Sequence, residues 1–286
     1  MKKVLITGAN SYIGQSFQKH VSLLEDVQVE ELDVREETWK QKDFSSFDTI
    51  LHLAALVHIS NPAKEMEGMY NQVNTQLPYE LAKKAKQEGV KQFIFMSSMS
   101  VYGEVLGDRV ITKDTPELPT SFYGKSKLAA EQLLSSLESE KFRIAILRPP
   151  MVYGRQAKGN YQRLSKLAQK LPIFPLVNNQ RSMIYIDNLC EFIRLIVQYQ
   201  DSGLFYPQNQ DYVNTSQLVR EIKRVHGQKV FLLPAVHWIL KGLSRRAATL
   251  NKLFSDLTYA KDLSAYSQSY QVADFRSSIE KTEKGN

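Results

Sequence analysis

The sequence predicts an α/β protein with a doubly wound parallel sheet and a smaller C-terminal annex. Through the first half, short runs rich in β-branched residues alternate with longer stretches at helical spacing, the pattern of parallel strands joined by crossover helices. A glycine-containing loop follows the first run, and the alternation ends after Leu147, where prolines become frequent. The expected strands are residues 4–7, 27–32, 49–53, 92–97 and 143–147.

Two long helices are expected between these strands. Residues 61–88 show helical spacing that is interrupted near Pro78, and residues 123–138 carry apolar side chains on one helical face. After the last strand we expect a helix at 161–170, a short strand at 184–186, further helices and a polar tail from residue 267.

The chain is long enough for one large α/β domain with an annex. We predict a sheet domain over residues 1–150, to which residues near 182–200 return, and an annex over residues 151–286. The two parts are interleaved, because no linker-like segment separates them.

The composition is typical of a soluble globular protein, with 43% hydrophobic and 23% charged residues. No apolar run approaches the ~20 residues of a membrane span. The N-terminus enters the first strand directly, so we expect no signal peptide and a cytoplasmic protein. The single cysteine, Cys190, excludes an intramolecular disulfide framework and is expected to pack in a helix. The net charge of +7 suits nucleic acid, an anionic surface or phosphate-bearing ligands, and does not choose among them.

The loop at residues 7–14 has the context of a phosphate-binding loop. It follows a strand and opens a helix, whose N-terminal amides can hold a pyrophosphate. Ser11 stands where a third glycine normally lets the backbone approach phosphate, and a structural turn without ligand is the alternative interpretation. The residues expected to contact a dinucleotide are Gly8, Asn10, Ser11, Tyr12, Ile13 and Gly14.

An acidic residue follows the second strand at a typical distance from this loop. Asp33 lies where an acid often holds the adenosine ribose of NAD. Only one strand separates the first helix from residues 49–53, so the alternative is that Asp33 and Val34 lie along the adenine. No arginine clearly replaces an acid there. The sequence therefore predicts NAD or NADP without deciding between them.

A tyrosine and a lysine four residues apart are candidates for proton transfer. On a helix, Tyr123 and Lys127 lie one turn apart on one face, where the cation can stabilise a phenolate. Such a tyrosine is a usable acid or base near neutral pH. The spacing alone is weak, since Tyr79 and Lys83 share it.

Ser98 separates the two pairs. It follows the strand at 92–97, and a serine at the carboxyl end of a parallel strand points into the ligand-binding crevice, where it can donate to a carbonyl oxygen. The helix with Tyr123 begins 25 residues later, whereas Tyr79 has no such partner upstream. We predict that Ser98, Tyr123 and Lys127 act together and that Tyr79 and Lys83 lie on a helix surface.

Taken in order, these motifs resemble the extended short-chain dehydrogenase/reductase family, in its NAD-dependent epimerase/dehydratase branch that acts on nucleotide sugars. The resemblance covers residues 3–188 and is weak beyond. Its matches are residues 7–14 (TGANSYIG), 52–55 (HLAA), Asn74 in 70–75 (YNQVNT), 97–103 (SSMSVYG), 123–127 (YGKSK) and 147–154 (LRPPMVYG).

The resemblance implies a Rossmann-like dinucleotide domain, a substrate-binding annex and roles for further residues. Asn74 steadies the site, and Arg181 falls where relatives grip the substrate diphosphate. A surface ion pair is the alternative for Arg181. The residues implied in cofactor binding are Leu53, Ala54, Ala55, Asn74, Tyr123, Lys127, Pro150 and Val152, and those implied in substrate binding are Ser98, Ser100, Met151 and Arg181.

The triad alone does not name the reaction, because related dehydratases, C4 epimerases and 4-ketosugar reductases share it. Met99 and Ser100 follow Ser98 where dehydratases have an acidic pair, which disfavours dehydration. Met151 replaces an asparagine of many epimerases. We expect a reductase of a UDP-linked 4-keto-6-deoxy-N-acetylhexosamine used for surface polysaccharide, with a UDP-sugar 4-epimerase that holds NAD tightly as the alternative.

A non-catalytic protein of the same fold, binding a dinucleotide or RNA, is the alternative from another class. Such members commonly lose the tyrosine or the lysine, and no cluster of basic and aromatic residues indicates a nucleic-acid surface. The histidines show no ligand spacing, so no metal is expected. By analogy with relatives, the helices at 61–88 and 123–138 are expected to form a homodimer contact.

Residues 235–254 form a basic amphipathic pattern. Apolar residues from Val236 to Phe254 fall on one helical face, while Lys241, Arg245, Arg246 and Lys252 lie elsewhere. Such a helix can lie on an anionic membrane, which would make the protein peripheral to it. An annex helix that packs against the core or covers the sugar site is the alternative.

Overall fold

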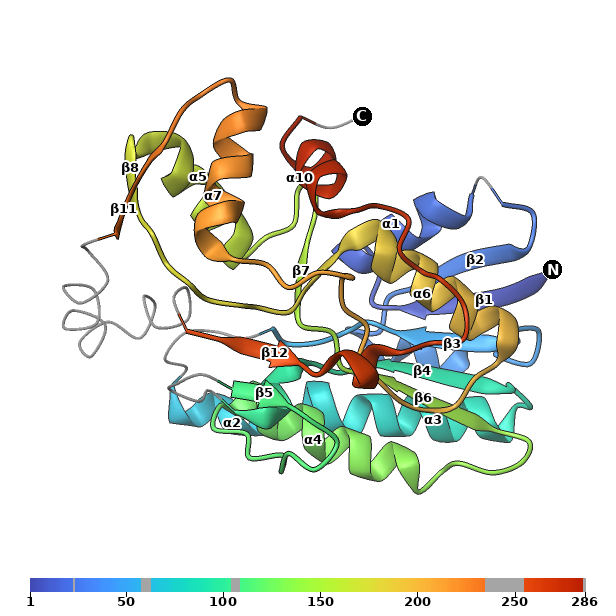
Figure 1. Cartoon of the computed structure of the whole chain (residues 1–286). Coiled ribbons are helices and arrows are strands. Elements are labelled where there is room, and N and C mark those ends of the chain that lie inside the picture. Colours follow the sequence, from blue (N-terminus) through green and yellow to red (C-terminus); the bar gives the residue numbers. More distant parts are fainter. Residues whose placement is uncertain (23, 58–62, 104–108, 235–254, 285–286) are drawn as a thin grey trace.

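The computed structural model describes residues 1–284 apart from 23, 58–62, 104–108 and 235–254. It confirms the α/β class, with a six-stranded parallel sheet between layers of helices (Figure 1). The strand order is β10-β6-β4-β3-β1-β2. The strands are β1 (Lys2–Thr7), β2 (Val27–Leu32), β3 (Thr49–His52), β4 (Gln92–Met96), β6 (Arg143–Leu147) and β10 (Gly203–Phe205).

Each face of the sheet is covered by its own helices. Helices α1 (Tyr12–Val21) and α6 (Ile186–Tyr199) pack together on one face, and α3 (Leu77–Gln87) and α4 (Phe122–Ser135) pack on the other (Figure 1). The strands β1, β3, β4 and β6 are buried on both sides, which explains their continuous apolar runs. Strand β2 forms one edge of the sheet, because no further strand follows it in the chain before β3.

The helix expected at 61–88 is interrupted near Pro78. Its described part consists of η2 (Lys64–Met66), α2 (Glu67–Asn71), a π-helical turn η3 (Gln72–Gln76) and α3. Pro78 lies in the first turn of α3, directly after the π turn, so its missing N–H falls where the hydrogen-bond spacing of the helix changes. The interruption that Pro78 predicted is therefore a π turn.

The annex stands beyond the carboxyl edge of the sheet (Figure 1). Its elements are β7 (Met151–Tyr153), α5 (Asn160–Lys170), β8 (Ile173–Pro175), β9 (Met183–Tyr185), α7 (Thr215–Val225), β11 (Phe231–Leu233) and α10 (Phe275–Lys284). The expected polar tail after residue 267 is wrong in part, since α10 packs on α7 and buries Ile279 completely. Helix α6 and strand β10 return to the sheet domain.

Short elements complete the described chain. Strand β5 (Arg109–Ile111) pairs with β12 (Leu257–Tyr259), and β7 pairs with β9. The 3₁₀ turns are η1 (Glu37–Gln41), η4 (Met99–Tyr102) and η6 (Lys261–Ser264). Among the described residues, no helix is long and apolar enough to cross a membrane.

Candidate active site

The residues singled out by the sequence gather at the carboxyl edge of the sheet. All strands run parallel, so the segments that follow β1, β3, β4 and β6 emerge at one edge. The register places Thr7 beside His52 and Met96 beside Leu147. Four motifs that are far apart in sequence therefore border one crevice.

Gly8 lets the phosphate loop approach the backbone of Ala54 closely. Its φ is +112°, a conformation that L side chains rarely adopt. A Cβ there would stand 2.6 Å from the backbone nitrogen of Ala54. The peptides of Leu53 and Ala54 both donate to the Thr7 carbonyl oxygen, which holds the two loops side by side.

Ser11, the departure from the glycine pattern, caps α1. Its hydroxyl accepts the Gly14 N–H at 3.2 Å, and its backbone is extended, as N-cap geometry requires. The first-turn amides of Tyr12 and Ile13 have no intrahelical partner, as at every helix start. These amides are the groups that a pyrophosphate would receive.

The adenosine side differs in detail from the expectation for Asp33 and Val34. Asp33 forms an exposed ion pair with Arg35, which lowers the Asp33 pKa to about 2 through hydrogen bonds to its carboxylate. The side chain of Val34 is only 5% exposed and packs in the core, so its main chain alone is left for the adenine. The arginine beside the acid was not recognised from sequence.

Glu31 is a second acid at this end that sequence reasoning missed. It lies at the end of β2 and accepts the backbone N–H of Asn10 at 3.2 Å. Asn10 adopts φ +62°, the left-handed conformation that asparagine tolerates better than most residues. The parallel pairing of Glu31 with Ile6 is the signal that could have found it, because it brings β2 beside the glycine loop.

The structure brings Ser98, Tyr123 and Lys127 together. Ser98 caps η4 and accepts the Ser100 N–H at 3.1 Å, so its own proton is free to point elsewhere. The Ser98 side chain lies close enough to that of Tyr123 to lower the Tyr123 pKa. The Lys127 Nζ lies 5.8 Å from the centroid of the Tyr123 ring and donates to the Met96 carbonyl at 2.8 Å.

Gly124 allows this close assembly. It follows Tyr123 in the first turn of α4, and a Cβ there would come within 2.5 Å of the Ser100 carbonyl oxygen. The absent side chain lets α4 contact η4, which carries the segment after Ser98. The Ser100 hydroxyl oxygen is buried and has no hydrogen-bond partner among the described residues, so it remains available to a ligand.

Burial controls the protonation of both groups. It raises the Tyr123 pKa to about 12, against the lowering effect of the Ser98 side chain. It lowers the Lys127 pKa to about 7, and the carboxylate of Glu131 opposes this. A phenolate on Tyr123 would favour the charged form of Lys127, so the two groups stabilise each other's ionised state.

The buried lysine predicts a pH effect on stability. Between pH 7 and 9 the unfolded chain keeps the Lys127 proton and the folded chain loses it, so the free energy of unfolding rises with pH. We expect a rise of about 1–2 kcal/mol from this group. Urea unfolding at pH 7, 8 and 9 measures it. Lys127→Met should lack the rise, whereas Lys83→Met, at an exposed site, should keep it; identical slopes in all three proteins would contradict the argument.

Asn74 ties together two segments near the carboxyl edge of the sheet. It is fully buried in the π turn η3. Its Oδ1 accepts the Leu56 N–H at 2.7 Å, and its Nδ2 donates to the Leu56 carbonyl and to the Ser126 hydroxyl. The side chain thus ties the segment after Ala54 and Ala55, both partly exposed, to helix α4.

The segment after β6 forms another wall. Pro149 accepts the Met99 N–H at 3.0 Å, which holds this segment next to η4. Pro150 is buried, while Met151 and Val152 are partly exposed in β7. An apolar thioether therefore stands where many epimerases present an amide.

Arg181 lies in the annex, beside β12. Its backbone pairs with Val213, and its Nη1 donates to the Ser255 carbonyl at 2.8 Å. Burial lowers its pKa, and nearby Asp256 opposes this. Among the described residues, no carboxylate forms a salt bridge with Arg181, which argues against the surface ion pair and leaves the guanidinium able to receive an anion.

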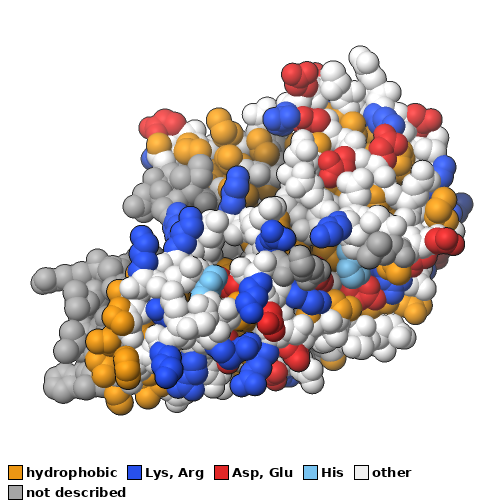
Figure 2. Space-filling view, turned by 90° about the horizontal axis from the view of Figure 1, so that it is seen from above, with side chains coloured by type: hydrophobic (Ala, Val, Ile, Leu, Met, Phe, Trp, Pro, Cys, Tyr) orange, Lys and Arg blue, Asp and Glu red, His pale blue; other side chains and the backbone are white. Residues whose placement is uncertain are grey.

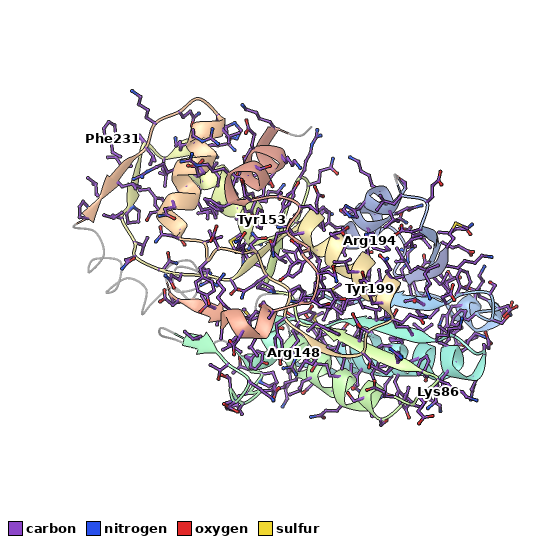
Figure 3. All side chains as sticks on the ribbon, turned by 45° about the vertical axis from the view of Figure 1, so that its right-hand side comes forward. Lys86, Arg148, Tyr153, Arg194, Tyr199 and Phe231 are labelled. Carbon is purple, nitrogen blue, oxygen red and sulfur yellow. The ribbon has the colours of Figure 1, made fainter. Side chains whose placement is uncertain are left out.

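A buried ionic network below the triad was missed from sequence. Arg148, 3% exposed at the end of β6 (Figure 3), holds the Glu131 carboxylate through Nε and Nη2. Its Nη1 donates to the Tyr102 hydroxyl at 2.6 Å and to Glu117 at 2.9 Å. Ser97 hydrogen-bonds the same Glu131. The available signal was Glu131, one helical turn after Lys127.

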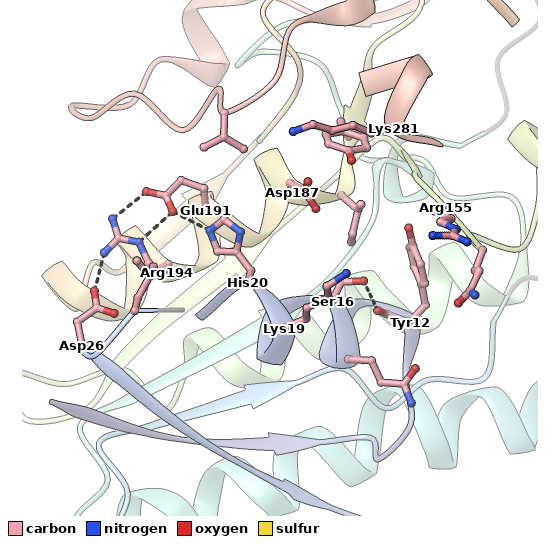
Figure 4. Close-up of a pocket in the computed structure, with 16 residues that line it drawn as sticks. Tyr12, Ser16, Lys19, His20, Asp26, Arg155, Asp187, Glu191, Arg194 and Lys281 are labelled. Carbon is pink, nitrogen blue, oxygen red and sulfur yellow. Dashed lines mark hydrogen bonds and ion pairs between the residues drawn. The ribbon is translucent and has the colours of Figure 1, made fainter. Parts of the chain in front are cut away.

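A pocket of about 830 Å³ lies elsewhere, between α1, α6 and α10 (Figure 4). Tyr12 lines it, so the ring of this predicted cofactor residue faces the pocket and only its main chain belongs to the phosphate loop. Its acids and bases are largely paired, as His20 and Arg194 both bind Glu191. The pocket contains none of the triad.

The sequence also singled out a second Tyr–Lys pair and the segment at 235–254. Tyr79 and Lys83 lie on α3 with the ammonium 5.6 Å from the ring centroid, and Lys83 is exposed, as expected for a surface pair. The amphipathic pattern at 235–254 lies outside the described residues. Within the described part of the chain, no group of His, Cys, Asp or Glu could hold a metal ion.

A family model described as the NAD dependent epimerase/dehydratase family matches residues 4–209. The chain belongs to this family. The match covers the glycine loop, the triad, Asn74 and Arg181. The protein is therefore an extended short-chain dehydrogenase/reductase enzyme of the branch that acts on nucleotide sugars.

Two curated relatives extend beyond the family match. A UDP-glucose 4-epimerase from Vibrio cholerae is 30% identical over 266 residues, covering 84% of this chain and 80% of that protein. An N-acetyl-α-D-glucosaminyl-diphospho-ditrans,octacis-undecaprenol 4-epimerase from Escherichia coli O157:H7 is 27% identical over 256 residues, covering 82% of this chain and 74% of that protein.

A solved dTDP-4-dehydrorhamnose reductase from Clostridium acetobutylicum has the same fold. Its TM-score is 0.75 at 18% identity, and the match covers 98% of each chain.

The residues present fit the dinucleotide that the family uses. A Cβ at Gly8 would meet the Ala54 backbone, so the glycine lets the loop close against the segment after β3, and the first-turn amides of α1 that follow the loop are available to a pyrophosphate. The loop and these amides would hold the pyrophosphate. Glu31 and Asp33, at the end of β2, would hold the adenosine end, and Tyr123 and Lys127 would hold the nicotinamide end.

Proposed function

We propose that the enzyme reduces the C4 carbonyl of a UDP-linked 4-keto-6-deoxy-N-acetylhexosamine in the synthesis of a surface polysaccharide. The observation that carries the proposal is the Ser98, Tyr123 and Lys127 cluster, together with an apolar Met151 in the segment that Pro149 ties to η4. A ketosugar that is reduced once does not need to turn over in the site. An amide that guides the sugar at the position of Met151 is therefore dispensable.

The chain's own residues supply the proton and orient the carbonyl. The Tyr123 phenol donates a proton to the C4 oxygen, and the Ser98 hydroxyl donates a hydrogen bond to the same oxygen. The Lys127 ammonium stabilises the phenolate that remains. When bound, the dinucleotide supplies the hydride to C4.

The substrate would lie between the triad and the annex. Arg181 is a partly buried cation without a carboxylate partner in the described chain, which supports a role in holding the diphosphate. The unpartnered hydroxyl of Ser100 supports a hydrogen bond to the sugar. Whether the enzyme takes NAD or NADP depends on the acids Glu31 and Asp33 with Arg35 beside them.

C4 epimerisation of a UDP-sugar is the second candidate. It is favoured by the two curated relatives, both of which are named as 4-epimerases. The same tyrosine would then remove and return the proton, and NAD would stay bound between the two hydride transfers.

One experiment separates the two reactions. The purified protein is analysed for bound dinucleotide and then mixed with the UDP-4-ketosugar and NADPH or NADH. We expect no retained NAD and stoichiometric oxidation of the added cofactor as the ketosugar is consumed. Retained NAD, together with interconversion of UDP-GlcNAc and UDP-GalNAc without net reduction, would instead establish the epimerase.

The assembly and location follow by analogy with relatives. We propose a homodimer through the faces of α3 and α4, located in the cytoplasm. A nucleic-acid partner is not part of the proposal, because the basic residues lack interleaved aromatic residues.

A further inference from the structure

The outer edge of the annex exposes apolar side chains on a two-stranded ribbon. Strands β8 and β11 pair in parallel with Ile173 beside Phe231. Phe174 is buried in the core, so the alternation of the strand turns Ile173 and Phe231 outward. They are 49% and 68% exposed, where a solvated strand would carry polar residues.

The neighbouring segments continue this apolar surface. We call it the annex edge and define it by Leu167, Leu171, Ile173, Leu176, Phe231 and Leu233, each at least 38% exposed. Figure 3 shows Phe231 at the far end of the annex, and Figure 2 shows hydrophobic side chains at that left-hand end beside Lys and Arg side chains. Contiguous apolar surface of this kind marks an interaction site.

The annex edge lies in two stretches of sequence that lack acids entirely. Residues 141–186 contain Lys or Arg at nine positions, and residues 222–255 at seven, with no Asp or Glu in either stretch. Lys166, Lys170 and Lys229 are exposed beside the apolar residues. Since the whole chain carries +7, the remaining sequence is net negative, and the excess of basic residues lies in these two stretches.

We infer that the annex edge docks on an anionic lipid bilayer. A bilayer offers both an apolar phase for the outward ribbon and negative charge for the lysines. A second copy of the edge would bring its exposed lysines against those of the first, which charge repulsion opposes. Nucleic acid offers the charge without an apolar phase for the ribbon.

The described chain on either side of residues 235–254 connects the annex edge with the proposed diphosphate site. The backbone leaves β11 at Pro234 and returns at Ser255, whose carbonyl accepts from Arg181. The intervening residues 235–254 lie outside the described chain, and their sequence also lacks acids. The proposed diphosphate end of the site therefore lies next to Ser255, where the described chain resumes.

Vesicle co-sedimentation of the full chain tests the inference without an activity assay. Vesicles of phosphatidylcholine with about one third phosphatidylglycerol are compared with pure phosphatidylcholine. We expect binding to the anionic vesicles at low salt, at least about tenfold weaker binding to the neutral ones, and loss of binding in 1 M salt, where the screening length is about 3 Å.

Two variants and one matched control locate the surface. Lys166→Gln/Lys170→Gln/Lys229→Gln and Ile173→Ser/Phe231→Ser should each weaken anionic-vesicle binding by about tenfold or more. The control Lys64→Gln/Lys83→Gln/Lys113→Gln removes the same charge from exposed positions elsewhere and should bind within about twofold of wild type.

Three outcomes would overturn the inference. They are equal binding to neutral and anionic vesicles, no binding to either, or edge variants that bind like the control. A large fall in Tm of the Ile173→Ser/Phe231→Ser protein with unchanged vesicle binding would also reject it, because it would show that the edge is covered within the protein. A soluble turnover assay is unaffected by any of these results.

Discussion

Replacing Tyr123 by phenylalanine is expected to lower kcat by about 10²–10⁴-fold while leaving the fold intact. The phenol hydroxyl is the only group removed. Because it donates the proton to the C4 oxygen, that proton is lost. Lys127 keeps its bond to the Met96 carbonyl, so affinity for the dinucleotide should change little. Single-turnover kinetics and dinucleotide binding measure the two effects separately.

Tyr79→Phe is the matched control, since Tyr79 and Lys83 have the same spacing on α3. This variant should retain wild-type kcat. Full activity of the Tyr123→Phe protein would reject the assignment of the proton donor. A comparable loss in both variants would show that the assay reports folding or assembly and not proton transfer.

Removing the buried guanidinium of Arg148 should cause the largest loss of stability. Arg148→Met leaves the Glu131 carboxylate, 4% exposed, without its cation and is expected to cost about 3–5 kcal/mol of unfolding free energy. Glu131→Gln should cost less, because Arg148 keeps the half-exposed Glu117 and the Tyr102 hydroxyl. Urea unfolding of both variants measures these changes.

Two further proteins make this prediction sharp. Arg148→Met/Glu131→Leu should recover part of the loss, since no unpaired charge stays buried. Lys40→Met breaks an exposed pair with Glu37 and should leave the unfolding midpoint unchanged. Equal midpoints for Arg148→Met and wild type would show that the network adds nothing to stability.

Local patterns in the sequence predicted the sheet strands apart from β10 and singled out the candidate triad. The runs that became β1, β3, β4 and β6 are buried on both faces, so they read as continuous apolar strands. Tyr123 and Lys127 share one helix, and Ser98 directly follows a strand. Each of these relations is set by short-range geometry that the sequence displays.

The annex was less predictable because its strands are three residues long and pair across large sequence separations. The bonds between β8 and β11 and between β5 and β12 join segments with no local signal. Helix α10 is largely polar, and only its contact with α7 buries Ile279. The polar composition of this segment therefore predicted a tail, and its packing on α7 became visible only in the tertiary structure.

The sequence by itself predicted the parallel sheet apart from β10, the context of the phosphate loop and the candidate proton-transfer residues, because these depend on strand ends and helical spacing. Only the tertiary structure decided that Ser11 caps α1, that Arg35 pairs with Asp33, that Val34 enters the core and that Arg148 binds Glu131. These contacts depend on side-chain rotamers and on segments that meet only when the chain is packed. The outward face of the β8–β11 ribbon belongs to the same class, since its exposure follows from which strand face the core covers.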